Sequence, residues 1–347
     1  MSVLLQCPPY SERNDGLFLK EINFLSEHHL AGCEAYGRIW KGWQPAQRIE
    51  DAPFVHVGVF KRIELKTEDD SITFKRSVHS SSTSGTSSRI ALDQKSSILQ
   101  SESVTKILGD FLGVEKRPLL ILDSVKSLRQ RGEMSARVAA AMSLRPLASD
   151  IVFLLKDSEN PGSMKWDELR NVLLNNDRLI IYGFSWILWL AWGAGAFPRD
   201  IKMLLRKKEI SFVHSGGWKK LESIRVDHSD FNQAVLRHVR TGSKVVDFYG
   251  LVEQMGIIYP MCECGARHVP VWADVVIRDV YTLKPIMEET GQIQLLNVLA
   301  YGAPYHSVLT EDVGRLIPGD CPCGRQGRRF DLLGRVPKAE IRGCANV

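Results

Sequence analysis

Residues 212–219 read Phe-Val-His-Ser-Gly-Gly-Trp-Lys, a strand-like run that meets two glycines and continues toward a helix. Glycines at the carboxyl end of a strand allow a ligand to lie against the backbone at the edge of an open sheet. A plain tight turn is an equally good interpretation. The run therefore indicates a strand–turn–helix unit, and it leaves open whether His214, Gly216 and Gly217 contact a ligand.

Strand-like and helix-like segments alternate on both sides of this run. Residues 166–174 and 231–239 have helical character, and Asp227 or Ser229 could cap the second helix. Such alternation predicts an α/β domain with a largely parallel sheet. The expected strands are residues 118–122, 151–155, 179–182, 210–214 and 245–249.

The two ends of the chain differ from this middle region. The first fifty residues have helical spacing of apolar side chains, and residues 54–60 alternate like a strand. Beyond residue 260 the pattern is mostly β. We therefore expect an α/β body over 1–255, a smaller β-rich subdomain over 256–335, and a tail over 336–347.

The composition excludes several classes of protein. The 347 residues are 44% hydrophobic and 24% charged, which is typical of a globular protein and not of a disordered, collagenous or disulfide-scaffold chain. The net charge of +5 is too small to indicate a nucleic-acid partner.

One apolar stretch raises the question of a membrane span. Residues 179–197 carry no charge over a length that could cross a bilayer. The alternative is a buried strand at 179–182, a break, and an apolar helix from Trp186. A single span would put the motifs described here on opposite sides of a membrane. We therefore favour the second interpretation and expect no span.

The start of the sequence bears on the compartment, and the compartment on how the cysteines are interpreted. The first seven residues have no basic region of the kind that begins a secretory signal. We therefore expect a cytoplasmic protein, in which paired cysteines are metal ligands rather than disulfides. The seven cysteines are Cys7, Cys33, Cys262, Cys264, Cys321, Cys323 and Cys344.

A hydroxyl-rich stretch, residues 80–89, reads Ser-Ser-Ser-Thr-Ser-Gly-Thr-Ser-Ser-Arg. Hydroxyls and closely spaced backbone N–H groups can surround a phosphate, and glycine permits the tight turn that this needs. On composition alone, a solvated linker is the favoured alternative. The candidate phosphate-binding residues are Ser82, Thr83, Ser84, Gly85, Thr86 and Ser87.

Two later motifs carry carboxylates. Residues 247–253 read Asp-Phe-Tyr-Gly-Leu-Val-Glu, and Glu253 could hold Mg²⁺ beside a phosphate. Thr310-Glu311-Asp312 precedes a basic run that includes Arg335. A carboxylate can accept hydrogen bonds from both hydroxyls of a ribose, and arginine can bind phosphate. Taken singly, each of these motifs is equally typical of charged residues on a solvated surface.

In this order the motifs resemble those of the adenylate-forming superfamily, which includes the acyl- and aryl-CoA synthetases. The Ser/Thr/Gly stretch is similar to its phosphate loop, and Gly216-Gly217 to its adenine-contacting glycines. Residues 249–253 resemble its Y-G-x-T-E motif with valine for threonine, and 310–312 its T-G-D motif with glutamate for glycine. The resemblance implies the fold of that superfamily's N-terminal domain, and ATP-binding roles for Tyr249, Gly250, Asp312 and Arg335.

The resemblance is closer to one family, the acyl-protein synthetases of the bacterial luminescence fatty-acid reductase complex. His214–Lys219, residues 248–254 and the ending Ile-Arg-Gly-Cys at 341–344 carry it. It implies that a fatty or other carboxylic acid is adenylated by ATP and Mg²⁺, and that the acyl group passes to Cys344. Glu253 and Thr86 are then catalytic.

The resemblance also implies that the superfamily's mobile C-terminal domain, with its catalytic lysine, is largely absent, because only twelve residues follow Arg335. Either a local lysine such as Lys219 or Lys338 replaces that lysine, or the phosphates are stabilised without one. Two other functions stay open. The protein could be a CoA ligase that uses coenzyme A as acceptor, or a non-catalytic adenylate-binding subunit of a reductase assembly. An acyl reductase or acyl carrier is an expected partner.

The late cysteines predict a metal site. Cys262, His268, Cys321 and Cys323 supply three thiolates and one imidazole, a set suited to a closed tetrahedral zinc site. Cys264 is a possible substitute ligand. Unligated buried cysteines are the alternative. Such a site would have a structural role, because it would tie the loop after Glu253 to the segment after Asp312.

Overall fold

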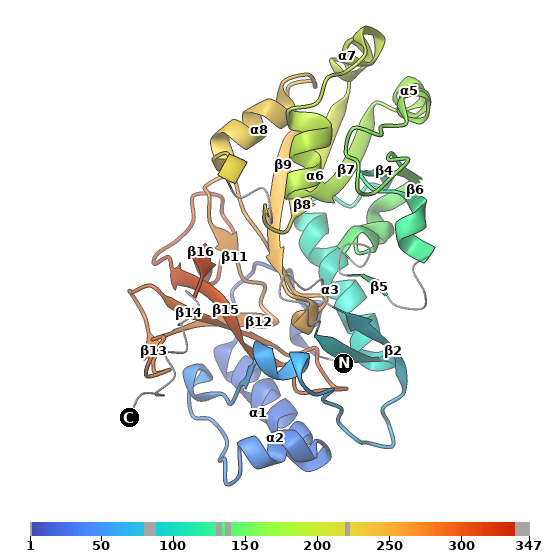
Figure 1. Cartoon of the computed structure of the whole chain (residues 1–347). Helices are drawn as coiled ribbons and strands as arrows, with labels where there is room; N and C mark the ends of the chain where they lie inside the picture. Colours follow the sequence, from blue (N-terminus) through green and yellow to red (C-terminus); the bar gives the residue numbers. More distant parts are fainter. Residues whose placement is uncertain (1, 80–87, 130–133, 136–139, 219–222, 337–347) are drawn as a thin grey trace, which may run out of the picture.

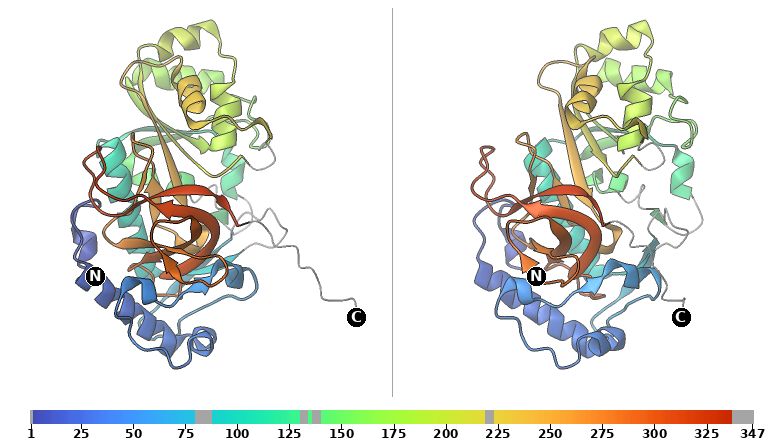
Figure 2. Two further views of the ribbon diagram at one scale, coloured as in Figure 1. Left: turned by 90° about the vertical axis from the view of Figure 1, so that its left-hand side faces the viewer. Right: turned by 60° about the vertical axis from the view of Figure 1, so that its left-hand side comes forward.

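The computed structural model describes residues 2–79, 88–129, 134–135, 140–218 and 223–336. These residues form sheets of six, seven and three strands. Figure 1 shows the six-stranded sheet and its helices in the upper half of the molecule, and the seven-stranded sheet in the lower half beside α1 and α2. Both views in Figure 2 show the same two-part arrangement.

The six-stranded sheet is parallel except at one edge, where β9 pairs antiparallel with β10. The inner strands β7 and β8 bury nearly every residue, which is the pattern of parallel strands covered on both faces. The predicted parallel sheet is confirmed. Its strands, in order, are β10 (Ile258–Pro260), β9 (Lys244–Gly250), β8 (Glu209–Ser215), β7 (Arg178–Phe184), β4 (Arg117–Ile121) and β6 (Ala148–Phe153).

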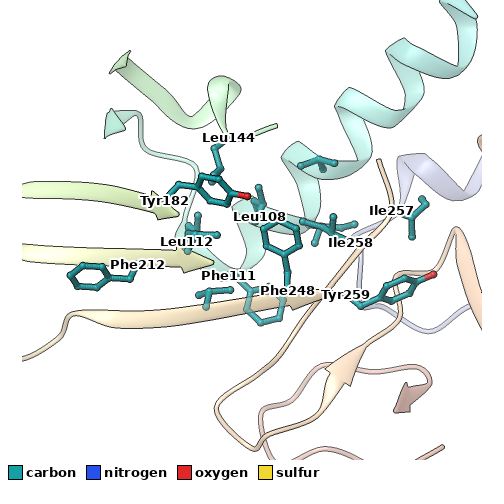
Figure 3. Packing of buried hydrophobic residues seen from close by; sticks show 14 of the residues in the cluster. Leu108, Phe111, Leu112, Leu144, Tyr182, Phe212, Phe248, Ile257, Ile258 and Tyr259 are labelled. Atoms are coloured by element: carbon teal, nitrogen blue, oxygen red, sulfur yellow. The ribbon is translucent and has the colours of Figure 1, made fainter. Parts of the chain in front are cut away.

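The longest helix, α3 (Gln94–Leu112), packs its apolar side against this sheet. It begins where the Asp93 carboxylate accepts a hydrogen bond from the Ser96 N–H, and it ends at Gly113 with φ +85°. Figure 3 shows its side chains beside Tyr182 and Phe248, whose rings stack with centroids 6.5 Å apart. The other helices of this half are α5 (Trp166–Asn175), α6 (Ser185–Leu188), α7 (Arg199–Leu205) and α8 (His228–Leu236).

The uncharged stretch 179–197 divides into a strand and a helical segment as the sequence predicts, but the predicted break between them is wrong, because β7 continues to Phe184. Its first part lies in β7, and α6 follows directly at Ser185 and continues as a single π-helical turn, η6 (Trp189–Gly193). Trp192 is buried, and its indole N–H donates to the Val235 carbonyl. This stretch is therefore part of the core. Within the described ranges, no helix combines the length and the apolar character that crossing a membrane requires.

The seven-stranded sheet is antiparallel along its main path, and one strand from the N-terminal region joins it in parallel. That strand is β1 (Val55–His56), which pairs with Val308 and Leu309 of β15. The remaining strands, in order, are β11 (Arg267–His268), β16 (Arg329–Arg335), β15 (Ser307–Leu316), β14 (Gly291–Asn297), β12 (Ala273–Arg278) and β13 (Pro285–Ile286). The predicted subdomain boundary near residue 255 stays a prediction.

The expected strand at residues 54–60 is wrong beyond His56. The chain turns there into the 3-10 helix η3 (Val57–Lys61), because the His56 ring nitrogen Nδ1 accepts a hydrogen bond from the Gly58 N–H at 3.1 Å. Val55, Val57 and Val59 alternate as they would in a strand, whereas the structure buries Val57 and Phe60, which are three positions apart as on one side of a helical turn.

The helical N-terminus is confirmed as α1 (Asp15–Gly32) and α2 (Glu34–Ile39). Arg13, just before α1, donates to the Asp274 carboxylate of β12, and the His29 ring contacts the Ala300 carbonyl. A three-stranded sheet of β3 (Arg89–Asp93), β2 (Phe74–His79) and β5 (Met134–Ser135) completes the fold. The remaining short helices are η1 (Leu4–Gln6), η2 (Ile49–Asp51), η4 (Val125–Arg129), η5 (Arg145–Leu147) and η8 (Val252–Gln254).

The chain between β9 and β10 depends on a close approach to α3 at Gly256. This glycine has φ +85°, and a Cβ added to it would lie 2.2 Å from the Gln100 Cβ. We expect Gly256→Ala to lower the free energy of unfolding by roughly 2–5 kcal/mol, from the strained φ and the backbone shift together. Gly242→Ala is the control, because Gly242 has φ +99° with nothing within 4 Å of the added atom. Denaturant unfolding measures both, and equal losses would contradict the role of the Gln100 contact.

Candidate functional site

A cavity of about 420 Å³ lies where the parallel strands β8 and β9 end against β15 and β16. In Figure 1, β9 runs from beside α8 toward the antiparallel sheet. Carboxyl ends of parallel strands are where open α/β sheets bind ligands. The cavity is lined by seven residues that the sequence singles out, from three separate motifs: His214, Gly216, Gly217, Tyr249, Gly250, Asp312 and Arg335.

Asp312 is the buried carboxylate of this cavity, at 8% exposure. The Tyr249 hydroxyl donates to Asp312 Oδ2 at 2.7 Å, and Arg335 Nε lies 3.4 Å from Oδ1. Burial raises the pKa of Asp312, while Tyr249 and Arg335 lower it in part. The carboxylate is thus held in one orientation and retains acceptor capacity for ligand hydroxyls.

His214 lines the cavity, and its hydrogen bonds decide which ring nitrogen carries the proton. Its Nδ1 lies 2.9 Å from Ser185 Oγ, and that hydroxyl donates to the Gly216 carbonyl at 2.7 Å. The hydroxyl therefore accepts from Nδ1–H, which leaves the unprotonated Nε2 as the other ring nitrogen. Nε2 is buried and has no hydrogen-bond partner among the residues described. Desolvation lowers the pKa of His214 to about 4, so the ring is neutral near pH 7.

The two glycines leave the backbone open beside His214. Gly216 has φ +77°, a conformation that favours glycine, and a Cβ on Gly217 would meet nothing within 4 Å. The turn after β8 therefore brings bare backbone to the cavity wall. This is the geometry that a planar ring or a phosphate requires for close approach.

Glu253 is not among the side chains that line this cavity, although it lies in η8 just beyond β9. It is only 5% exposed. Burial raises its pKa, while the Ser88 hydroxyl and the Lys61 charge lower it. Ser88 directly follows residues 82–87, the predicted phosphate loop with Thr86. That loop and Cys344 lie outside the described residues.

A second cluster brings together the four predicted metal ligands. The ligand atoms of Cys262, His268, Cys321 and Cys323 all lie within 4.8 Å of one another. Cys262 Sγ is 3.7 Å from Cys321 Sγ, and Cys323 Sγ is 3.3 Å from His268 Nε2. The sulfur separation is far too long for a disulfide. Cys264 is exposed and is not part of this group of four.

The two sites are linked through Arg267, which precedes His268 in β11. Its guanidinium donates to the Asp247 carboxylate of β9 and to the Tyr259 carbonyl. Asp247 in turn lies 3.7 Å from His214 Nδ1. Burial raises the pKa of Asp247, but the charge of Arg267 outweighs this effect and holds the pKa below its usual value. The cysteine–histidine cluster therefore lies next to the residues that orient one wall of the cavity.

Sequence reasoning missed three residues of this region: Ser185, Arg267 and Lys61. Ser185 is the first residue of α6, and its contact with His214 joins positions 29 apart. Lys61 contacts Glu311 across 250 positions. No local pattern marks such pairs. The one usable signal was Arg267 next to a predicted metal ligand.

Comparisons with known proteins agree with this geometry. A family model described as acyl-protein synthetase, LuxE, matches residues 12–347. Two proteins named long-chain-fatty-acid–luciferin-component ligase, from Aliivibrio fischeri and Vibrio harveyi, are each 26% identical over 140 and 143 residues. These matches cover 39% and 40% of this chain, and 36% of each relative. The matched segments thus span about a third of those relatives.

Solved structures show the same fold. An open conformation of 2-hydroxyisobutyryl-CoA ligase, in complex with 2-HIB-AMP and CoA, has a TM-score of 0.64 at 14% identity, covering 92% of this chain and 74% of that one. The same enzyme in its postadenylation state has a TM-score of 0.64 at 13% identity, covering 93% and 68%. The predicted fold class is confirmed.

Proposed function

The chain belongs to the LuxE family of acyl-protein synthetases, and from this premise we propose that it activates a fatty or other carboxylic acid with ATP and passes the acyl group to a protein cysteine. One observation carries the proposal. Motifs spread from His214 to Arg335 meet in a single cavity that offers open glycine backbone, a neutral histidine and an oriented carboxylate. These are the groups that an adenosine and its ribose hydroxyls would bind.

In the first step, a carboxylate oxygen of the acid attacks the α-phosphorus of ATP. The bond from that phosphorus to the bridging oxygen breaks, and pyrophosphate leaves with the electron pair. The products are acyl-AMP and pyrophosphate, and no redox partner is needed. Asp312 would hold the ribose hydroxyls, and Arg335 would add positive charge beside the phosphates.

In the second step, a cysteine thiolate attacks the acyl carbonyl and AMP leaves, which forms a thioester. Cys344 is the proposed acceptor. Val336, the last described residue, donates its backbone N–H to the Glu311 carbonyl, beside the cavity residue Asp312. An extended segment of the nine residues from Arg335 to Cys344 could reach roughly 30 Å.

Glu253 fits the role of a magnesium ligand. A buried carboxylate with a raised pKa has lost most of its hydration, and a hard divalent cation offsets that loss. Bound magnesium would supply positive charge to the phosphates. Glu253 would hold the ion, and the loop at residues 82–87 would contact the phosphates from the side of Ser88.

The cysteine–histidine cluster fits zinc. Sulfurs at about 2.3 Å from a shared tetrahedral ion lie roughly 3.8 Å apart, close to the 3.7 Å between Cys262 and Cys321. Desolvation lowers the pKa of His268 to about 4, so its ring is neutral, which is the form that ligates metal. We infer a structural role, because the four ligands come from segments on both sides of β15.

Acid-dependent exchange of labelled pyrophosphate into ATP tests the proposed activity. We expect exchange with one or more acids in a panel of fatty and aromatic acids. Glu253→Gln and Thr86→Ala should each slow it by about 30-fold to 10³-fold, since losing one such contact costs roughly 2–4 kcal/mol of transition-state stabilisation. Two results would contradict the proposal: pyrophosphate exchange that proceeds without an acid, and no exchange with any acid of the panel. Turnover driven by coenzyme A alone would identify a CoA ligase instead.

Metal analysis tests the zinc site. We expect about one zinc per chain, and Cys323→Ser should lower both the zinc content and the midpoint of thermal unfolding, because each thiolate is also a folding contact. Cys7→Ser, which changes a thiol outside the four ligands, is the control and should leave the zinc content unchanged. Unchanged stability in metal-free protein would be evidence against a structural metal.

Labelling with radioactive fatty acid and ATP tests the acceptor. Cys344→Ser should retain pyrophosphate exchange, because adenylation precedes the transfer, and should lose covalent label. Cys7→Ser serves as the control and should label like the parent. If Cys344→Ser labels normally, the acyl acceptor is another residue.

A further inference from the structure

A lysine from the N-terminal region lies beside the candidate site. Lys61 Nζ is 3.2 and 3.3 Å from the two carboxylate oxygens of Glu311, the residue before Asp312. The Lys61 charge also acts on the buried Glu253 carboxylate. Lys61 therefore contacts the neighbour in sequence of the proposed ribose ligand Asp312, and its charge acts on the proposed magnesium ligand Glu253.

The fold holds the backbone of Lys61 firmly in this place. β1 pairs in parallel with β15 through Val55 and His56, and η3 follows directly. Val57 and Phe60 of η3 are buried in a small apolar cluster. That cluster also contains Ile90 and Leu92 of β3, the strand that follows the predicted phosphate loop, and Val252 packs against it. Lys61 thus extends from a rigid turn that touches three parts of the candidate site.

The side chain itself is free to change partner. The side chains of Lys61 and Glu311 are 28% and 44% exposed, and an ion pair so exposed contributes little to stability. The pair also supplies a physical role for Glu311, which stands where the related motif has glycine. Glu311 keeps the ammonium beside the site when no anion is bound.

The charges around the candidate site indicate which kind of ligand the Lys61 ammonium could bind. Glu253, Glu311 and Asp312 place three carboxylates along this side of the site, and mutual repulsion raises the pKa of Glu253 and of Asp312 beyond the effect of burial. A triphosphate brought here would add further negative charge. Two described cations act on these carboxylates. The Arg335 side chain is 70% exposed and pairs with Asp312, and the charge of Lys61 acts on Glu253.

We propose that Lys61 leaves Glu311 when ATP binds and donates hydrogen bonds to the α-phosphate, where it stabilises the charge that develops during adenylation. This inference rests on the proposed function. The ammonium stays protonated throughout. The carboxylate oxygen forms the new bond to phosphorus, and pyrophosphate leaves with the electrons of the broken bond. Lys219 and Lys338, the substitutes considered from sequence, lie outside the described residues.

Pyrophosphate exchange in three variants tests this role. Lys61→Met removes the charge and keeps the length of the side chain, and we expect it to lower kcat by about 10²-fold or more. Lys61→Arg should recover part of the rate, because it restores a cationic donor. Lys66→Met is the matched control. Lys66 pairs with Glu64 at 3.0 Å on the same segment and is 45% exposed, and its loss should change kcat less than twofold.

Glu311→Gln separates a phosphate contact from a structural ion pair. It breaks the same pair but leaves the ammonium, so we expect a loss of tenfold at most. Equal losses in Lys61→Met and Glu311→Gln would mean that Lys61 acts only through the pair, and would overturn the inference. So would normal kcat in Lys61→Met. If thermal unfolding shows that Lys61→Met does not fold, Lys61→Gln replaces it in the same assay.

The parent protein keeps the two proposals distinct. If the parent exchanges pyrophosphate with no acid in the panel, the proposed function fails. If the parent exchanges and Lys61→Met does so equally well, the function stands and only the assignment of Lys61 is overturned.

Discussion

The hydrogen bond from the Tyr249 hydroxyl to Asp312 joins the two large sheets at the point where the candidate site lies. Tyr249 comes from β9, in the parallel sheet, and Asp312 from β15, in the antiparallel sheet. Both side chains line the cavity, so the site exists only while the two sheets keep this relative position. Arg335, paired with Asp312 across the ladder of β15 and β16, strengthens the contact from the other side.

Contacts behind the cavity maintain that position. Arg267 connects β11 to Asp247 of β9, one residue before the metal-type ligand His268. The cluster of Cys262, His268, Cys321 and Cys323 joins the chain after β10 to the loop between β15 and β16. A metal there would tie the segment that follows β9 and β10 to the loop that follows β15. Tyr249 lies in β9, and Asp312 lies in β15. The contact between the two sheets and the geometry of the cavity therefore depend on the same strands and loops.

A third attachment comes from the N-terminal region. β1 and η3 join the antiparallel sheet through β15, and the buried face of η3 contacts the strand after the predicted phosphate loop. The candidate site is thus assembled from three parts of the chain that are far apart in sequence. Each part contributes charge: Lys61 from the first, Glu253 from the middle, and Asp312 and Arg335 from the last.

The sequence by itself determined the alternation of strands and helices, the position of the uncharged core segment, and the order of the motifs, because these depend on local periodicity and on glycine. It also singled out seven of the residues that line the cavity, since each belongs to a short motif with its own pattern. Only the tertiary structure decided which residues pair. That His56 ends a strand, that Ser185 orients His214, and that Lys61 meets Glu311 depend on how strands and helices far apart in sequence pack together, and no local pattern records such an approach.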